Sequence, residues 1–464
     1  MVRLPRRGGN GMSVTSKLTT LAAAGGGGGA YWYVVVDDSQ STSFNNVIVA
    51  SDDTVVCGGF RGNFNNLQMV TFDVNGSMDI EKIFSVSGFY LRGFGGIGLS
   101  INSSDNIAVS TTFVSTGGGI YRKGAFVVDK SLVRKTTSNK FMYKSASVKN
   151  TSSDFDTPVT AIDNNNFFYY WILASDSSDT PFVNRTDFDS SGSTAFRGRF
   201  SSPFGPTVPM SIISNTKFLV CGINRDDVRN ELICVNPTVL SATSNQNTVW
   251  KTNLQFQSSS AFYVRHIISE PDGNSYGVGS YMSDSQNKVG IFKISNSGSF
   301  AYKKYFSLSG ISGGYADGVA FDADGNLFYL GHDSSKNNVL VKFDTSGDML
   351  WSRKIAPTGI YNKSDVNNTY RTSGLSIDSV GDIYIATTWS TGALGEKSIL
   401  LKYPNDGSLS GTLTNVTITE LSTSSGTDAS SGNTTQEFDV WNDAANTDNV
   451  SSADFSPTAT LVSL

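Results

Sequence analysis

The sequence predicts an all-β protein, a β-propeller in which small antiparallel sheets repeat around a ring. A pattern of strand, tight turn and strand recurs seven times between Val47 and Tyr403. The clearest two copies, residues 318–331 and 374–387, align without a gap. A unit this short cannot bury both faces of its own sheet, so neighbouring units must stack on one another.

Each repeat opens with a strand in which alternate residues are apolar, as expected when one face is buried. The equivalent positions are Val47, Leu99, Thr160, Met210, Ile267, Val319 and Leu375, about 55 residues apart. The turn that follows is rich in Asp, Asn and Gly, which tolerate the positive φ angles of hairpins. A second strand, rich in aromatic and β-branched residues, comes next.

A second hairpin completes each repeat, because residues 70–80, 291–300 and 341–351 resemble one another. Four-stranded sheets repeated at this length are the blades of a propeller. A parallel β-helix would need shorter coils, and a sandwich would not repeat seven times. We expect seven blades; because the third and fourth repeats match least well, six or eight blades also fit the pattern.

Residues 31–36 resemble the fourth strand of a repeat but follow no first three strands. We expect Tyr31, Trp32 and Tyr33 to lie beside Leu400, in the strand 398–403, and to close the ring by covering that edge. Residues 411–418 compete for the same place. Trp32, Trp250 and Trp351 share one position in the fourth strand, which indicates packing between blades and not a sugar-stacking platform.

The chain divides into three predicted parts. Residues 1–30 form a flexible Ala/Gly-rich N-terminal arm, residues 31–418 the propeller, and residues 419–464 an acidic tail rich in Ser, Thr, Asn and Asp. The tail is either solvated or docked on a partner. Met12 competes with Met1 as the true start.

Composition excludes several classes of protein. A net charge of −5 argues against binding nucleic acid, which needs a basic face. No apolar run is long enough to span a membrane, and the start lacks a convincing secretion signal. Cys57, Cys221 and Cys234 are expected to be small buried core residues that need no disulfide.

No catalytic residue, cofactor site or metal site is predicted. His266 and His332 have no ligand at metal-binding spacing, so we expect them at the surface or at strand ends. Residues 322–326 resemble half of a calcium loop but lack the distal Glu and flanking helices, which favours a hairpin turn. Residues 93–98 lead into a strand, which favours a connecting loop over a phosphate cradle.

Residues 16–32, which run directly into the repeats, resemble structural proteins of tailed bacteriophages, marine phages and cyanophages in particular. The resemblance implies a non-enzymatic virion protein, tail-associated, that serves assembly or host-surface attachment. It would be made in the host cytoplasm and be present in several copies per particle.

The partners that this resemblance implies are tail or capsid proteins and a host-surface glycan or protein. The N-terminal arm, including Lys17, Leu18 and Leu21, is the predicted virion anchor. Two alternatives stay open: a bacterial cell-surface or secreted binding propeller, and a propeller enzyme that acts on polysaccharide.

Overall fold

The computed structural model describes most of the repeats and short parts of both terminal segments. The described residues are 17–21, 31–36, 41–62, 66–85, 89–91, 97–115, 121–135, 140–143, 160–165, 167–173, 181–187, 194–200, 209–224, 229–238, 248–254, 262–270, 273–281, 288–307, 315–333, 335–358, 362–363, 373–390, 395–413, 416–421, 427–428, 440–442, 451–454 and 458–461.

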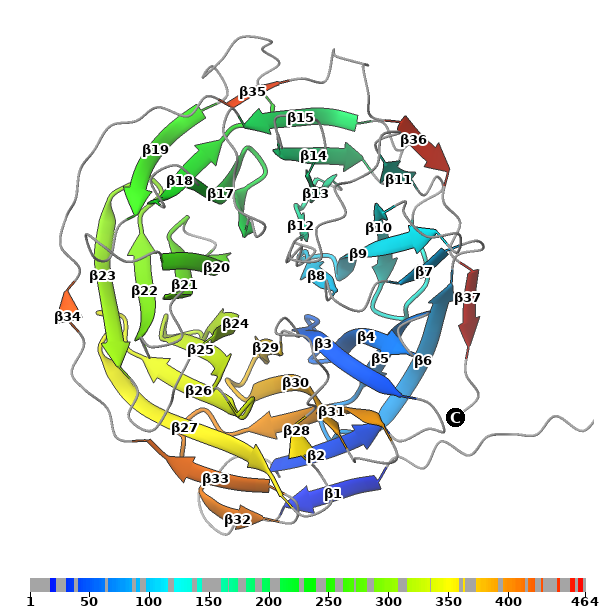
Figure 1. Ribbon diagram of the computed structural model, residues 1–464, viewed down its shortest axis with the longest axis vertical. Coiled ribbons are helices and arrows are strands. Elements are labelled where there is room, and N and C mark those ends of the chain that lie inside the picture. The colour runs from blue at the N-terminus through cyan, green and yellow to red at the C-terminus, as the bar shows by residue number, and fades with distance from the viewer. Residues whose placement is uncertain are drawn as a thin grey trace, which may run out of the picture.

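The described strands fall into seven antiparallel sheets that surround a central opening (Figure 1). Among the described residues there is no helix that could cross a membrane. The prediction of an all-β chain with a β-propeller arrangement is therefore confirmed. We number the sheets 1 to 7 in the chain order of their inner strands.

Sheets 1 to 4 follow one another along the chain. Sheet 1 contains β3 (Thr42–Val49), β4 (Val55–Arg61), β5 (Asn66–Phe72), β6 (Met78–Ser85) and β37 (Thr458–Leu461). Sheet 2 contains β7 (Phe89–Leu91), β8 (Gly98–Ile101), β9 (Asn106–Ser115), β10 (Tyr121–Asp129), β11 (Lys140–Tyr143) and β36 (Ser451–Asp454). Sheet 3 contains β12 (Thr160–Ile162), β13 (Phe167–Leu173), β14 (Pro181–Asp187), β15 (Thr194–Phe200) and β35 (Val440–Asn442). Sheet 4 contains β16 (Met210–Ser214), β17 (Lys217–Asn224), β18 (Arg229–Val235) and β19 (Thr248–Leu254).

Sheets 5 to 7 complete the set. Sheet 5 contains β20 (Phe262–Ser269), β21 (Ser275–Tyr281), β22 (Lys288–Ile294), β23 (Phe300–Ser307) and β34 (Thr427–Asp428). Sheet 6 contains β24 (Tyr315–Phe321), β25 (Leu327–His332), β26 (Asn338–Phe343), β27 (Met349–Pro357), β32 (Gly411–Leu413) and β33 (Val416–Glu420). Sheet 7 contains β1 (Lys17–Leu21), β2 (Tyr31–Val36), β28 (Asn362–Lys363), β29 (Gly374–Ile377), β30 (Ile383–Ser390) and β31 (Glu396–Tyr403).

The inner strands β3, β8, β12, β16, β20, β24 and β29 contact one another in that order, and β29 contacts β3 again. Apolar side chains fill the spaces between neighbouring sheets. Between sheets 1 and 2, for example, Phe60 and Leu67 pack with Ile107 and Phe126. The seven sheets thus bury their faces against one another around a closed circle.

The turn between the first two strands of sheet 6 shows why the sequence forms tight hairpins. One carboxylate oxygen of Asp322 accepts hydrogen bonds from the backbone N–H groups of Asp324 (3.1 Å) and Asn326 (2.9 Å). Gly325 adopts a φ of 78°, which a residue without a Cβ reaches at little cost. The predicted hairpin turn at residues 322–326 is confirmed, whereas residues 93–96 of the glycine-rich segment lie outside the described residues.

Strand β2 lies beside β31, with Val34 opposite Leu400 and Tyr33 opposite Leu401. Trp32 is 1% exposed and belongs to one apolar cluster with Leu400 and with Phe44 of sheet 1. The competing segment, residues 411–418, does not occupy this place. It contributes to the hairpin of β32 and β33, which pairs with the outer edge of β27 in sheet 6.

An aromatic side chain of the fourth strand repeatedly packs on a turn glycine of the next sheet. Trp32 lies against Gly76, Trp250 against Gly298 and Trp351 against Gly407, and Tyr302 repeats the contact with Gly347. Each Trp Nε1 also donates a hydrogen bond to a carbonyl of that turn: Trp32 to Val74 (3.2 Å), Trp250 to Asn296 (2.7 Å) and Trp351 to Asn405 (3.2 Å). The prediction that these tryptophans pack between blades is confirmed.

All three cysteines are free and buried, as predicted. Cys221 on β17 and Cys234 on β18 lie on neighbouring strands but face Leu232 and Leu219 across the ladder. They pack with Leu254 and Ile267 in the apolar cluster between sheets 4 and 5. Burial raises the pKa of the Cys221 and Cys234 thiols, the latter to about 12, which keeps them protonated.

The C-terminal segment is not simply a solvated tail. Strands β33, β34, β35, β36 and β37, here called the belt, pair with the outermost repeat strands of sheets 6, 5, 3, 2 and 1 in that order (Figure 1). The physical reason is that an outer strand presents a row of unpaired backbone groups, which a polar, β-prone tail can satisfy. The described strands of the tail thus pair with the chain's own ring, which neither predicted alternative, a solvated tail or one docked on a partner, included.

The N-terminal arm also differs from the prediction. Residues 17–21, expected to be flexible, form β1 and pair with β2 along its outer edge, Leu18 opposite Val34 and Leu21 opposite Tyr31. The β-branched residues Thr19 and Thr20 of this segment favour a strand once an unpaired edge lies beside it. Residues 1–16 and 22–30, which hold the glycine run, lie outside the described residues.

The turns of neighbouring sheets are also joined to one another on one side of the ring. Ser51 donates to Asp105 from its backbone N–H (2.9 Å) and hydroxyl (2.8 Å), and Ser379 donates in the same way to Asp53. Ser103 makes the equivalent pair of bonds to Asn164. These bonds fix the relative height of adjacent sheets.

We predict that Gly76→Ala destabilises the ring through its contact with Trp32. A Cβ at Gly76 would lie 2.8 Å from the Trp32 ring, at a φ of 83°. Gly411→Ala is the matched control, because Gly411 also has a positive φ (101°) but nothing lies within 4 Å of its Cβ position. Urea unfolding should show a loss of about 2–4 kcal/mol for Gly76→Ala and about 1 kcal/mol for Gly411→Ala. Equal losses would mean that the contact contributes nothing.

We also predict that the fold loses stability in acid. Burial raises the pKa of Asp105, but hydrogen bonds from Ser51 and Lys130 outweigh it, so the pKa lies below its usual value. Asp322 and Asp333 are lowered in the same way, against burial, by bonds from Asn326 and Lys342 and from Lys354 and Asn337. Groups with a lowered folded pKa contribute stability above the unfolded pKa, and that contribution disappears as the pH falls through the folded value.

Burial raises the pKa of Asp378, so this carboxyl works in the opposite direction and offsets part of the effect. The midpoint of urea unfolding should therefore be constant near neutral pH and fall below about pH 4. Asp105→Asn should flatten that fall relative to the unmodified protein. A midpoint that rises with acid would show that the raised group dominates.

Candidate functional site in the central channel

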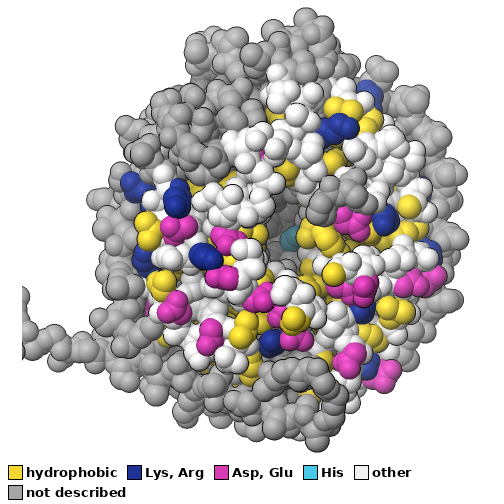
Figure 2. Space-filling model, turned by 180° about the vertical axis from the view of Figure 1, so that it is seen from behind, with side chains coloured by type: hydrophobic (Ala, Val, Ile, Leu, Met, Phe, Trp, Pro, Cys, Tyr) yellow, Lys and Arg dark blue, Asp and Glu magenta, His cyan; other side chains and the backbone are white. Residues whose placement is uncertain are grey.

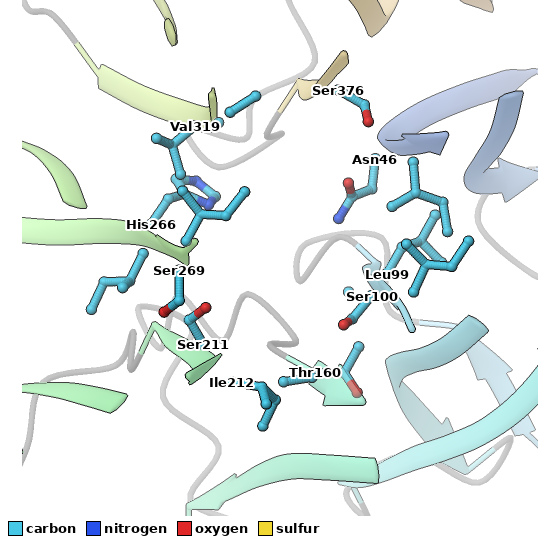
Figure 3. A pocket seen from close by; sticks show the side chains of 18 of the residues that line it. Asn46, Leu99, Ser100, Thr160, Ser211, Ile212, His266, Ser269, Val319 and Ser376 are labelled. Atoms are coloured by element: carbon cyan, nitrogen blue, oxygen red, sulfur yellow. The ribbon is translucent and has the colours of Figure 1, made fainter. Parts of the chain in front are cut away.

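The inner strands of all seven sheets enclose one channel with a volume of about 570 Å³. Side chains from every sheet line it, as Figure 3 shows for Asn46, Leu99, Ser100, Thr160, Ser211, Ile212, His266, Ser269, Val319 and Ser376. Short hydroxyl and branched apolar side chains predominate, because bulky residues on seven converging strands would fill the space. Figure 2 shows the opening from one side, with Lys, Arg, Asp and Glu side chains mixed around it.

Three of the inner strands carry a β-bulge at the same place. The pairing register shifts between Phe44 and Asn46 in β3, between Val264 and His266 in β20, and between Ala316 and Gly318 in β24. The extra residues are Asn45, Arg265 and Asp317. A bulge inserts one residue into a strand and turns its side chain in a new direction, which is common beside functional sites.

Ser373 occupies the equivalent place in sheet 7, directly before β29. The four residues Asn45, Arg265, Asp317 and Ser373 line the channel near the start of the inner strands, and we call this region the polar end. Arg265, Asp317, Ser373 and Asn45 belong to sheets 5, 6, 7 and 1, which are consecutive around the ring.

Asp317 is held by a buried histidine. Its carboxylate lies 2.7 Å from Nδ1 of His332, and the two side chains are 3% and 5% exposed. His332 ends β25, the strand that pairs with β24, so the hairpin itself brings the two groups together. Of the two predicted places, the surface or a strand end, His332 has the second, and the carboxylate compensates its burial.

His266 lines the channel next to Arg265. Burial lowers the pKa of His266 to about 4, opposed by the charge of Asp317 and assisted by that of Arg265. The imidazole is therefore neutral at neutral pH and offers one donor and one acceptor to the channel. The sequence placed the two histidines in unrelated registers, whereas the fold brings both near Asp317.

Asn45 is the most unusual group of the polar end. It is 2% exposed; its Oδ1 accepts a hydrogen bond from Ser43 (3.4 Å), while its Nδ2 has no hydrogen-bond partner among the described residues. Thr388 of sheet 7 donates to the carbonyl of Phe44 (3.2 Å) and so holds the bulge in place. A buried amide group without a hydrogen-bond partner lowers the stability of the fold, and such groups are rare in folded proteins.

A second polar group lies where β20 ends. Glu270 accepts hydrogen bonds from Tyr276 and from Asn274 (3.2 Å), and Lys293 lies 3.9 Å away. All these partners come from sheet 5, and they hold the turn between its first two strands. Glu270 therefore has a structural role, although it also borders the channel.

Within the described part of the chain, no group of three His, Cys, Asp or Glu side chains is arranged to hold a metal ion. What the polar end offers is hydrogen bonding: a guanidinium, a carboxylate, a hydroxyl and an amide, with a neutral imidazole beside them.

The other residues named from the sequence lie away from the channel. Trp32, Tyr33 and Leu400 belong to the buried contacts of β2 with sheets 7 and 1, and Tyr31 pairs with Leu21 on β1. Lys17, Leu18 and Leu21 lie in β1, the outermost strand of sheet 7. The structure therefore brings the residues predicted to close the ring together on one sheet and places the residues predicted to anchor the protein at its outer edge.

The sequence did not reveal the polar end, although a signal was present. The alignment of repeats puts Asn45, Arg265 and Asp317 two residues before Val47, Ile267 and Val319. Polar residues at one position in three apolar strands indicate a shared role, but only the bulges show that they line the channel.

No protein-family model matches this chain, and no curated protein matches it. Among solved structures it is similar to the fucose-specific lectin from Aleuria aurantia (8% identity, TM-score 0.39), covering 66% of this chain and 92% of the lectin. It is also similar to the polysaccharide lyase Uly1 (10% identity, TM-score 0.44), covering 78% of this chain and 90% of the lyase. A protein of unknown function from Bacteroides caccae gives 10% identity and a TM-score of 0.33, covering 71% and 91%. Likenesses this distant indicate neither a shared ligand nor a shared activity.

We predict that Asp317→Ala destabilises the protein by about 1–3 kcal/mol, because His332 loses the carboxylate that compensates its burial. Asp324→Ala, at an exposed position in the turn that follows β24, is the control and should change stability by less than about 0.5 kcal/mol. Urea unfolding monitored by tryptophan fluorescence measures both. A loss for Asp317→Ala no greater than that of the control would mean that the buried pair does not stabilise the fold.

Proposed function

We propose that this protein is a non-enzymatic structural component of a tailed-phage virion, tail-associated, which serves assembly and attachment to the host surface. We infer that each of the seven sheets is one blade and that β2 closes the ring. The observation that carries the proposal is the covering of outer edges by both terminal segments, β1 on sheet 7 and the belt on sheets 6, 5, 3, 2 and 1.

Covered edges suit a protein that is present in several copies on one particle. Open strand edges at high local concentration pair with one another and aggregate. Here short terminal strands occupy the edges of six sheets, and charged side chains of both signs surround the opening in Figure 2. A rigid disc of this kind holds its loops and channel in fixed positions for binding.

The resemblance of residues 16–32 to phage structural proteins supports the virion setting. In this proposal the N-terminal segment joins the disc to a tail or capsid protein, with Lys17, Leu18 and Leu21 at the contact. Their position in β1, at the outer edge of sheet 7, leaves the opposite side of the ring facing away from the anchor.

A second candidate is an enzyme that acts on polysaccharide. The grouping of Arg265, His266 and Asp317 at one end of the channel favours it, because a neutral imidazole beside a carboxylate and a guanidinium can serve proton transfer. Incubation of the purified protein with host polysaccharide tests this candidate. Shortened chains with the unmodified protein, but not with His266→Gln, would establish it and overturn the non-enzymatic proposal.

The virion proposal predicts that Lys17→Glu combined with Leu18→Ser and Leu21→Ser prevents incorporation of the protein into particles. The ring should stay folded, because β1 is the outermost strand of sheet 7 and pairs with the outer edge of β2. Electron microscopy and immunoblotting of purified particles measure incorporation, and urea unfolding measures the fold. The matched control is Asp448→Lys with Asp454→Ser, in the C-terminal segment.

Incorporation is expected to fall at least about tenfold for the β1 variant and to be unchanged for the control. A β1 variant that is incorporated normally would remove the proposed anchor. Absence of the unmodified protein from every particle would overturn the virion setting itself.

A further inference from the structure

The four residues that define the polar end of the channel come from consecutive sheets of the ring. Arg265, Asp317, Ser373 and Asn45 lie at equivalent positions of four consecutive inner strands, so they form an arc along one side. In sheet 2, the next one round, Ile97 holds the equivalent position and is buried among apolar side chains. The polar groups at this end thus come from four consecutive sheets, and the arc ends at an apolar residue in sheet 2.

Members of the arc are fixed from behind. His332 holds the carboxylate of Asp317, Thr387 contacts the hydroxyl of Ser373 at 3.0 Å, and Thr388 holds the bulge that carries Asn45. These supporting side chains come from the second strands of sheets 6 and 7. Preorganised polar groups lose little conformational freedom when a ligand binds.

Asn45 supplies the second, independent observation. Asn45 is among the residues that line the channel, is 2% exposed, and keeps its Nδ2 without a hydrogen-bond partner among the described residues. Exchange of the amide oxygen and nitrogen would still leave one amide atom of Asn45 without a partner among the described residues. A ligand in the channel would satisfy it.

The order of groups along the arc identifies the chemistry of that ligand. Arg265 donates, Asp317 accepts, Ser373 can do both, and Asn45 donates. Hydroxyl groups on adjacent carbon atoms of a sugar both donate and accept, so they match alternating partners. An anionic ligand fits less well, because the buried carboxylate of Asp317 lies in the same arc as Arg265.

We propose that the polar end of the channel binds one residue of a neutral glycan, with its hydroxyl groups on Asp317, Ser373 and Asn45. This inference rests on the proposed function for its purpose, since it names the substrate class of host-surface attachment. The binding itself requires only the folded ring. The site is distinct from the anchor in β1, so either can fail without the other.

Isothermal titration of the purified full-length protein tests the site. The probes are glucose, galactose, mannose, fucose and N-acetylglucosamine, with glucuronic acid and inorganic phosphate as the anionic arm. We expect at least one neutral sugar to bind and both anions to bind more weakly. Binding of an anion alone, or of no probe, would overturn the proposal.

Asn45→Leu separates a binding role from a structural one. The substitution removes the unpartnered amide, so urea unfolding should show an unchanged or raised midpoint, while affinity for the sugar falls at least about tenfold. Ser211→Ala, which lines the channel on β16 outside the arc, is the matched control and should bind within about twofold of the unmodified protein.

Asn45→Ala provides the same comparison if Asn45→Leu does not fold. A variant that loses stability but keeps its affinity would show that Asn45 serves the fold alone. If particles that carry Asn45→Leu still adsorb normally to the host, sugar binding at this site does not serve attachment. That result would overturn the link to the proposed function but not the sugar binding measured by titration.

Discussion

The structure depends on the burial of both faces of every sheet against its two neighbours. A four-stranded sheet of this size has too little apolar area to fold alone, so each apolar cluster is shared between adjacent sheets, as between β2, β31 and sheet 1. The repeated contact of Trp32, Trp250, Trp351 and Tyr302 with a turn glycine of the next sheet sets the distance between sheets. Between sheets 1 and 2, Leu132 takes the place of the turn glycine, at a φ of 58°, and Ile80 takes the place of the aromatic residue. Leu132 belongs to the apolar cluster between these two sheets, and Ile80 packs against the same cluster. A contact between the fourth strand of one sheet and a turn of the next is therefore also present where two aliphatic residues replace the aromatic residue and the glycine.

Edges impose the second constraint. A ring of sheets hides faces but leaves an outer strand on every sheet with unpaired backbone groups. The chain meets this constraint with its own termini, which add β1 and the belt to six of the sheets. Where side chains of these segments are described, Val416 and Ile418 of β33 and the adjacent Leu421 pack against apolar clusters of the ring. Backbone pairing does not require apolar side chains, so a composition typical of solvated tails is compatible with strands.

The central channel is a consequence of the ring of sheets, and it is the place where a ligand could bind. Inner strands converge, so short hydroxyl and branched apolar side chains predominate along the channel, and the bulges in β3, β20 and β24 add larger polar residues to its lining. The buried pair of Asp317 and His332 and the unpaired amide of Asn45 reduce stability or need compensation. Polar groups kept in a wall at such a cost are typical of sites that bind ligands.

The sequence alone determined the all-β class, the repeat, the hairpin turns and the role of the tryptophans, because these follow from local patterns of apolar residues, turn residues and glycines. Tertiary structure decided what depends on contacts between distant segments. The C-terminal belt pairs with outer strands that precede it by up to several hundred residues, and β1 pairs with the outer edge of β2. His332 is buried against Asp317. The tertiary structure also gathers Asn45, Arg265 and Asp317 at one end of the channel. Bulges have no strong sequence signature, and the partner of an edge strand is set by whichever segment the closed ring brings beside it.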